Sequence, residues 1–264
     1  MPLLRNDALS PSETLARTLD PCLIARDAGL PELHPEQVRV LRHWRRDVLA
    51  LWSRQSGKSL MAAIAAVHQL LFPSNPEHTP TVVIVARAER QSSECFRKAK
   101  QVYSKLSYAP PLRTDAATAV EIPSGGRIVC YPGSEEGVRG LSAVGLAVID
   151  EASLCERELV DAISPMLSTT GGPLWCLGTG RAGENWFREA WENPALDRIV
   201  LKSHLPWDKV PHIDKAFVEK ERARMPSWQF SQEYEAQFVD AGESILISRE
   251  TILAAVNPEE RALW

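Results

Sequence analysis

A short polar segment around residue 55 constrains the fold of this chain more than any other feature. It lies between an apolar run at 48–52 and a helix-forming run at 60–71. In a strand–loop–helix unit, the N–H groups of the loop and the positive end of the helix dipole point into one small volume, which polyphosphate naturally occupies. We therefore predict a phosphate-binding loop made of Ser53, Arg54, Gln55, Ser56, Gly57, Lys58 and Ser59.

Two residues at the end of this loop carry its expected chemistry. Lys58 is placed to reach the outer phosphates as a point charge, and the Ser59 hydroxyl is placed to bind the Mg²⁺ that accompanies a nucleoside triphosphate. The match to the usual motif is imperfect, because Trp52 stands where that motif has its first glycine. A solvated turn is the alternative for so short a pattern.

A second motif follows the apolar run 144–149, which has the composition of a strand buried on both faces. Asp150 and Glu151 come directly after it, at the carboxyl end where an open parallel sheet forms its ligand crevice. Asp150 can hold Mg²⁺ directly or through water, and Glu151 can polarise the water that attacks the terminal phosphate. An ordinary Asp-Glu turn would leave the upstream phosphate-binding loop unexplained.

A third predicted strand, at 173–177, ends in Gly178, Thr179 and Gly180. Its small polar end is expected at the same crevice. There Thr179 could respond to the presence of the third phosphate and pass that signal to the segment after it. A simple glycine turn explains the local sequence equally well.

Four segments occur in a characteristic order: 53–59, Val138-Arg139-Gly140, 148–152 and 177–179. Together they resemble the ATPase domain of phage terminase large subunits, the DNA-packaging motors of tailed phages. Segment 33–37 looks like the adenine-recognising glutamine motif of that family, and segment 232–238 looks like the part that leads towards its nuclease domain. The resemblance covers roughly residues 33–240. An arginine inside the phosphate-binding loop, here Arg54, is itself typical of terminases.

The resemblance implies a role for each matching residue. Lys58 and Ser59 would hold phosphate and Mg²⁺, Asp150 the metal, and Glu151 the attacking water. Arg139 matches an arginine proposed to reach into the site of a neighbouring subunit, where such a group is worth about a thousandfold or more in rate.

Two further assignments stay open. Arg54 is the rival charge stabiliser, acting within its own subunit, and a solvated charge or structural ion pair is the alternative for either arginine. The Gln37 amide could pair with adenine, although a glutamine on a helix face is usually solvated.

Strands that alternate with helices predict an α/β fold with a mostly parallel sheet between helices. The resemblance makes it a P-loop NTPase of the additional-strand catalytic-glutamate type. Beyond the segments above, we predict helices at 34–46, 88–106, 157–166, 184–191, 214–224 and 227–237, strands at 81–86 and 198–201, and a hairpin pairing 120–122 with 127–130.

The expected domain organisation follows from the end of the strand–helix alternation after Ser203, where prolines interrupt the sequence. We predict an ATPase core at 1–204, with residues 1–30 forming a short helix with loops or an arm against a neighbour. A small helical lid and linker would occupy 205–264. Terminase large subunits usually carry a nuclease domain after this point. This sequence ends at Trp264, before room for such a domain, so either it is a fragment or the natural protein lacks cutting activity. Because segment 238–247 still resembles the linker of that family, we expect a fragment that hydrolyses ATP but does not cut DNA.

Composition limits the possible partners. The net charge of −4 does not suit a protein that coats nucleic acid, so DNA contacts must be local. The candidates are Arg97, Lys98, Lys100, Lys215, Lys220, Arg222 and Arg224, for which a solvated helix face is the blander explanation. Five scattered cysteines suit a reducing compartment, and no apolar run is long enough for a membrane span.

The partners and cofactors that the resemblance implies are ATP, Mg²⁺, double-stranded DNA, a portal protein and a small terminase subunit. The working form would be a homo-oligomeric ring on a procapsid in the host cytoplasm, with a monomer as the alternative for the isolated chain. Two other functions stay open. One is a helicase-like or repair ATPase stimulated by single-stranded or forked DNA, and the other is a nucleotide-binding regulatory module that does not turn over.

Overall fold

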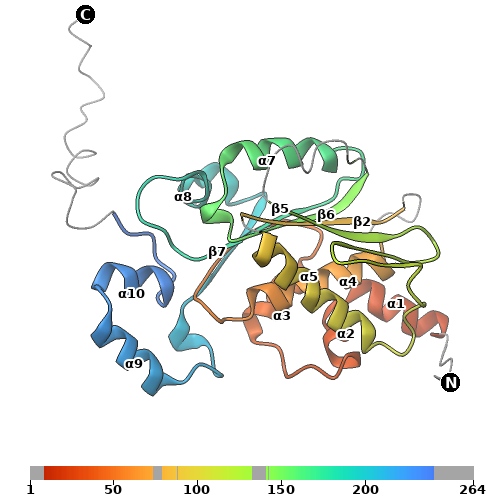
Figure 1. Cartoon of the computed structure of the whole chain (residues 1–264), viewed down its shortest axis with the longest axis horizontal. Helices are drawn as coiled ribbons and strands as arrows, with labels where there is room; N and C mark the ends of the chain where they lie inside the picture. Colours follow the sequence, from red (N-terminus) through yellow and green to blue (C-terminus); the bar gives the residue numbers. More distant parts are fainter. Residues whose placement is uncertain (1–8, 74–78, 88, 133–140, 142, 241–264) are drawn as a thin grey trace, which may run out of the picture.

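A single mixed sheet between two layers of helices organises the molecule (Figure 1). The computed structural model describes residues 9–73, 79–87, 89–132, 141 and 143–240. The strands are β1 Asp47–Trp52, β2 Thr81–Ala86, β3 Thr114–Asp115, β4 Ala119–Glu121, β5 Arg127–Pro132, β6 Val144–Asp150, β7 Leu174–Gly178 and β8 Val200–Leu205. The α-helices are α1 Pro11–Leu19, α2 Cys22–Asp27, α3 Pro35–Arg42, α4 Lys58–Leu71, α5 Glu89–Ser104, α7 Arg157–Ile163, α8 Trp186–Glu192, α9 Lys215–Arg224 and α10 Ser227–Glu233.

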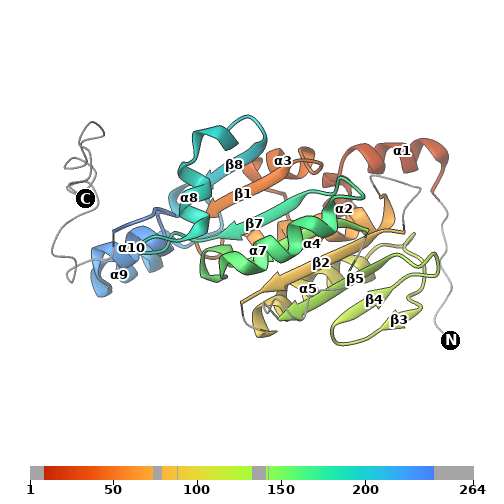
Figure 2. The same ribbon diagram turned by 90° about the horizontal axis from the view of Figure 1, so that it is seen from above.

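The strand order is β3-β4-β5-β2-β6-β7-β1-β8. Pairing is parallel from β5 to β8, and β4 pairs antiparallel with both β3 and β5. Strand β7 lies between β1 and β6, pairing Val48 with Trp175 on one side and Ile149 with Cys176 on the other. This extra strand confirms the predicted additional-strand type. Because β6, β7 and β1 pair in parallel, their carboxyl ends lie at one edge of the sheet, and Figure 2 shows β7 beside β1.

Alternating side chains on the strands feed two separate cores. In β1, Ala50 and Trp52 face the layer that contains α4 and α5, while Leu49 and Leu51 face α7 and α8. Helix α4 is buried from Met61 to Leu70, and its four alanines allow close approach to the sheet. The helix after the phosphate-binding loop is therefore held firmly in the core.

Helices α9 and α10, which belong to the segment predicted as a lid and called the lid below, lie beyond the sheet at one end of the molecule (Figures 1 and 2). Trp207, Val218 and Phe230 pack together as the core of the lid. The lid joins the sheet at the end of β8, and the Ser53 N–H donates to the Leu205 carbonyl at 2.8 Å. The start of the phosphate-binding loop is thus bonded to the start of the lid.

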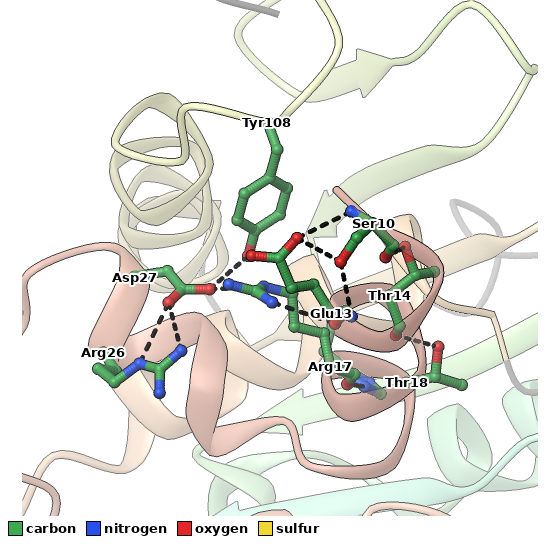
Figure 3. Close-up of polar contacts among 9 residues, drawn as sticks. Ser10, Glu13, Thr14, Arg17, Thr18, Arg26, Asp27 and Tyr108 are labelled. Carbon is green, nitrogen blue, oxygen red and sulfur yellow. Dashed lines mark hydrogen bonds and ion pairs between the residues drawn. The ribbon is translucent and has the colours of Figure 1, made fainter. Parts of the chain in front are cut away.

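The N-terminal residues form two helices that pack on the same chain, where the sequence predicted one short helix with loops. Arg17 is buried, and its Nε donates to Asp27 Oδ2 at 2.7 Å, while the Tyr108 hydroxyl donates to the same carboxylate oxygen at 3.1 Å (Figure 3). The Arg17 guanidinium also lies 5.1 Å from the centre of the Tyr108 ring. This cluster ties α1 and α2 to the segment after α5.

A buried histidine joins the same region to α4. His68 Nε2 donates to the Arg17 carbonyl at 2.9 Å, and its ring packs edge-on against Trp44. Burial lowers the pKa of His68 to about 4. Because the unfolded chain then binds more protons between about pH 4 and 6.5, this residue adds stability above that range, and the contribution is lost as the pH falls through it.

We expect the free energy of unfolding to lose ~2 kcal/mol through His68 alone between pH 7.5 and pH 5. Urea denaturation at several pH values measures this. His68→Leu should flatten the pH dependence over this range, even if the variant is less stable overall. Leu70→Ala, a core substitution on the same helix that removes no titratable group, should keep the wild-type pH dependence. Equal pH dependence in the wild type and His68→Leu would contradict the assignment.

Most predicted elements lie within a few residues of their expected positions, including the hairpin of β4 and β5. The helix predicted at 157–166 is shorter, because Pro165 has no N–H to continue α7 and the chain forms a 3₁₀ turn at Ser164–Leu167. Strand β8 starts later than predicted and continues to Leu205. Among the described helices, none has the length and apolar character needed to cross a bilayer.

Candidate active site

The predicted phosphate-binding loop connects β1 to α4. Gly57 has φ +90°, and a Cβ there would lie 2.4 Å from Gln37 Nε2, so only glycine fits without displacement. Lys58 Nζ donates to the carbonyls of Trp52 and Ser53, both at 2.8 Å. The loop therefore curls around its own lysine, and phosphate oxygens would have to replace these carbonyls as partners of the ammonium group.

Gln37 is buried against this loop instead of being solvated. Its Nε2 donates to the Ser56 carbonyl at 3.4 Å, and its Oε1 accepts from the His34 N–H at 2.8 Å. The amide that was predicted to pair with adenine thus supports the loop backbone beside Gly57. Ser56 is also buried, and its hydroxyl donates to the Ser53 carbonyl at 2.7 Å.

The acidic end of β6 meets the first turn of α4. Ser59 Oγ donates to Asp150 Oδ2 at 2.9 Å, although β7 separates the strands that carry the two motifs. Asp150 is 5% exposed, and its Oδ1 accepts from the Glu151 N–H at 3.0 Å. The two motifs therefore meet in space, as the sequence predicted.

Glu151 has the features of a residue held for function. Its backbone is left-handed, with φ +54°, a region that favours glycine and that often marks functional positions. The Leu154 N–H donates to its carbonyl at 2.8 Å and fixes the turn after β6. Within the described part of the chain, its buried Oε2 has no hydrogen-bond partner. This oxygen is free to accept a proton or a hydrogen bond from a water molecule.

Burial dominates the electrostatics of the site. It raises the pKa of Asp150, and the Lys58 charge partly offsets this effect. Burial and then the neighbouring Asp150 charge raise the pKa of Glu151, which moves this carboxylate towards the range of a useful general base. Burial also lowers the pKa of Lys58 to about 8. Phosphate groups would supply negative charge that favours the charged form of Lys58.

Thr179 lies directly after β7, at the same sheet edge as Asp150, whose register partner is Leu177. It is half-buried, and it begins a segment that contacts the lid. At the next position, a Cβ on Gly180 would lie 1.8 Å from the Gln237 carbonyl oxygen. The chain after Thr179 therefore packs directly on the end of the lid.

Of the two arginines predicted to stabilise charge, the structure describes only Arg54. The Arg54 guanidinium is exposed and pairs through Nε with Glu233 Oε2, at the end of α10. Arg139 lies outside the described residues. The exposed Gln55 has φ +57°, and the lid residue His212 donates from Nε2 to its carbonyl at 2.8 Å.

Glu233 and His212 are the site residues whose roles the sequence did not predict. Glu233 belongs to the segment at 232–238 that resembles the family, but nothing in its local pattern points to Arg54. His212 follows a proline in a polar stretch that is typical of a loop. Both residues join the site only through the docking of the lid, which leaves no periodic signal along the chain.

The residues present fit a magnesium ion. Ser59 and Asp150 offer one hydroxyl and one carboxylate at hydrogen-bond distance, and Mg²⁺ typically takes one or two carboxylates together with phosphate oxygens and water. When bound with a nucleotide, the ion would neutralise charge on the phosphates. The arrangement as a whole suits phosphoryl transfer to water.

Comparisons with known proteins agree with this geometry. The family described as "Terminase large subunit, T4likevirus-type, N-terminal" matches residues 49–252. A point mutant of the large terminase ATPase domain of Thermus phage P74-26 matches with a TM-score of 0.67 at 20% identity, covering 81% of this chain and 97% of that one. No curated protein sequence matches.

Two longer terminases share the fold. The large terminase of bacteriophage HK97 has a TM-score of 0.68 at 18% identity, over 84% of this chain and 55% of its own. The large terminase of a thermophilic bacteriophage, solved in complex with ADP, has a TM-score of 0.63 at 14% identity, over 78% and 54%. The chain thus spans about half the length of these two proteins. The family match covers most of the chain, so the chain belongs to the terminase large subunits, over the part that the family description calls N-terminal.

Proposed function

We propose that this domain binds Mg-ATP between the loop at 53–59 and the carboxyl end of β6, and that hydrolysis drives double-stranded DNA into a procapsid. The observation that carries the proposal is the 2.9 Å contact between Ser59 and Asp150, together with the adjacent Glu151, whose buried Oε2 has no hydrogen-bond partner in the part of the chain that the structure describes. The large terminase of the thermophilic bacteriophage, which shares this fold, has been solved with ADP and with ATP-γ-S.

Each residue has a distinct task in the proposed reaction. Backbone N–H groups of the loop and the Lys58 ammonium hold the outer phosphates. Ser59 and Asp150 would hold Mg²⁺. Glu151 accepts a hydrogen bond from the attacking water through Oε2 and aligns it with the third phosphate.

The arginines would offset charge on the transferred phosphoryl group. Arg54 can do so from its own loop, and Arg139 would act from a neighbouring subunit in a ring. Thr179 would respond to the third phosphate. Because the chain after it packs on the lid, a change there would move the lid relative to the sheet.

The remaining partners follow from the family: duplex DNA, a portal protein and a small terminase subunit. The protein would work in the host cytoplasm. Five of the seven basic residues proposed for local DNA contact already have acidic partners. The pairs are Arg97 and Lys98 with Glu94, Lys100 with Asp115 on β3, Arg222 with Glu219 and Glu235, and Arg224 with Glu221. The DNA contacts would therefore be transient phosphate contacts presented around the ring.

Phosphate release tests this function. We expect release to depend on Mg²⁺ and to stop when a chelator removes the ion. Asp150→Asn should raise the Mg²⁺ concentration for half-maximal rate by about tenfold or more, and Asp208→Asn, an exposed carboxylate on the lid, should not. With the portal present, duplex DNA should stimulate the rate more than single-stranded or forked DNA. The opposite preference would support a helicase-like ATPase instead.

A further inference from the structure

The lid touches the phosphate-binding loop at Arg54 and Gln55. The Arg54 N–H donates to the Glu233 carbonyl at 2.8 Å, and the Arg54 side chain pairs with the carboxylate of the same glutamate. His212 donates to the Gln55 carbonyl at 2.8 Å. One lid residue, Glu233, therefore engages both the backbone and the side chain of Arg54.

The Glu233 carboxylate belongs electrostatically to the nucleotide site. Its Oε2 atom is buried and, among the described residues, makes the ion pair with Arg54 but no hydrogen bond, and its side chain is 23% exposed. Its charge interacts with Lys58 and with Glu151, as well as with Arg54. A negative group on the lid thus lies among the residues that would surround the last phosphate.

Carboxylate and phosphate compete for the same partners. A guanidinium binds either a carboxylate or a phosphate with its planar N–H groups. The Nε edge of one guanidinium cannot pair fully with both anions at once. A third phosphate that approaches Arg54 would also bring negative charge towards Glu233. A diphosphate lacks the third phosphate and therefore competes little with Glu233 for Arg54.

We propose that Glu233 is a specificity-determining residue of the ATP site, whose carboxylate holds Arg54 in place of the third phosphate and so weakens triphosphate binding selectively. This inference rests on the proposed nucleotide site. Triphosphate binding separates Glu233 from Arg54, and loss of the third phosphate lets the pair form again. Because Glu233 ends α10, the exchange connects the third phosphate to the lid.

Nucleotide affinities of charge-neutral variants test the proposal. Calorimetric titration with Mg-ATP-γ-S and with Mg-ADP should show that Glu233→Gln binds the triphosphate analogue about fivefold more tightly than wild type does. The ADP affinity should change less than about twofold. Glu235→Gln is the matched control: it removes a nearby lid carboxylate that contacts Ser231 and Arg222, so it should change neither affinity.

A double-mutant cycle assigns the effect to the pair. In an Arg54→Gln background, Glu233→Gln should give no gain in triphosphate affinity, and a gain that persists would overturn the proposal. So would equal gains for both nucleotides, or no gain. If Glu233→Gln does not fold, Arg54→Gln alone must lower the triphosphate affinity and leave that for ADP unchanged. A wild-type chain that binds neither nucleotide would refute the proposed site, whereas binding without selectivity would refute only this inference.

Discussion

Replacing Glu151 by glutamine will lower the rate of phosphate release by about two to four orders of magnitude, the range expected for loss of general-base catalysis. The structure leaves Glu151 Oε2 buried and unpartnered among the described residues, and burial raises its pKa towards that of an effective base. Glutamine keeps the shape of the side chain but cannot take up a proton. Affinity for Mg-ATP-γ-S should therefore be retained.

Steady-state phosphate release and calorimetric titration separate the two effects. Glu158→Gln is a suitable control, since it neutralises an exposed carboxylate on α7 and should keep the wild-type rate. A Glu151→Gln protein that hydrolyses ATP at the normal rate would reject the role of Glu151. It would also revive the interpretation of the domain as a nucleotide-binding module in which this residue is idle.

Replacing Lys58 by alanine should weaken Mg-ATP-γ-S binding by about ten- to a hundredfold, because charge-assisted hydrogen bonds to phosphate contribute ~1.5–3 kcal/mol each. Turnover should fall further, since charge on the phosphates grows in the transition state. Lys58 Nζ donates only to loop carbonyls, at 2.8 Å, among the described residues. Lys105→Ala, an exposed lysine, serves as the control. Unchanged nucleotide affinity in Lys58→Ala would mean that phosphates bind elsewhere.

The Lys58 variant also reports on Arg139. If Arg139 acts in a neighbouring site, mixing Lys58→Ala subunits with Arg139→Ala subunits should restore hydrolysis in some sites of a ring. Activity that never exceeds that of either variant alone, in mixtures shown by light scattering to assemble, would argue for action of Arg54 within one subunit.

The local parts of the fold could be predicted from the sequence. The apolar runs that form β1, β2 and β6 are short and bounded by polar residues. Helix α4 begins directly after Gly57, a position whose positive φ favours glycine. The pairing of the Ser59 and Asp150 motifs was also predicted, because carboxyl ends of parallel strands share one edge. These features depend on residues close together in the sequence, or on a general rule of sheet geometry.

Other features depend on contacts between distant segments. The burial of Gln37 beside Gly57 and the pairing of Arg54 with Glu233 arise only when α3 and the lid dock on the loop. The two-residue strand β3 is too short for a periodic pattern. The position of the N-terminal helices also depends on a distant contact, because it is set by Arg17, Asp27 and Tyr108 coming together across the fold.

A structure of this chain with Mg-ATP-γ-S tests the central claim most directly. The account predicts phosphates against the backbone of residues 54–59, Lys58 Nζ turned from the loop carbonyls to phosphate oxygens, and Mg²⁺ beside Ser59 and Asp150. A nucleotide bound elsewhere, with the Lys58 contacts and the Ser59–Asp150 hydrogen bond intact, would contradict it.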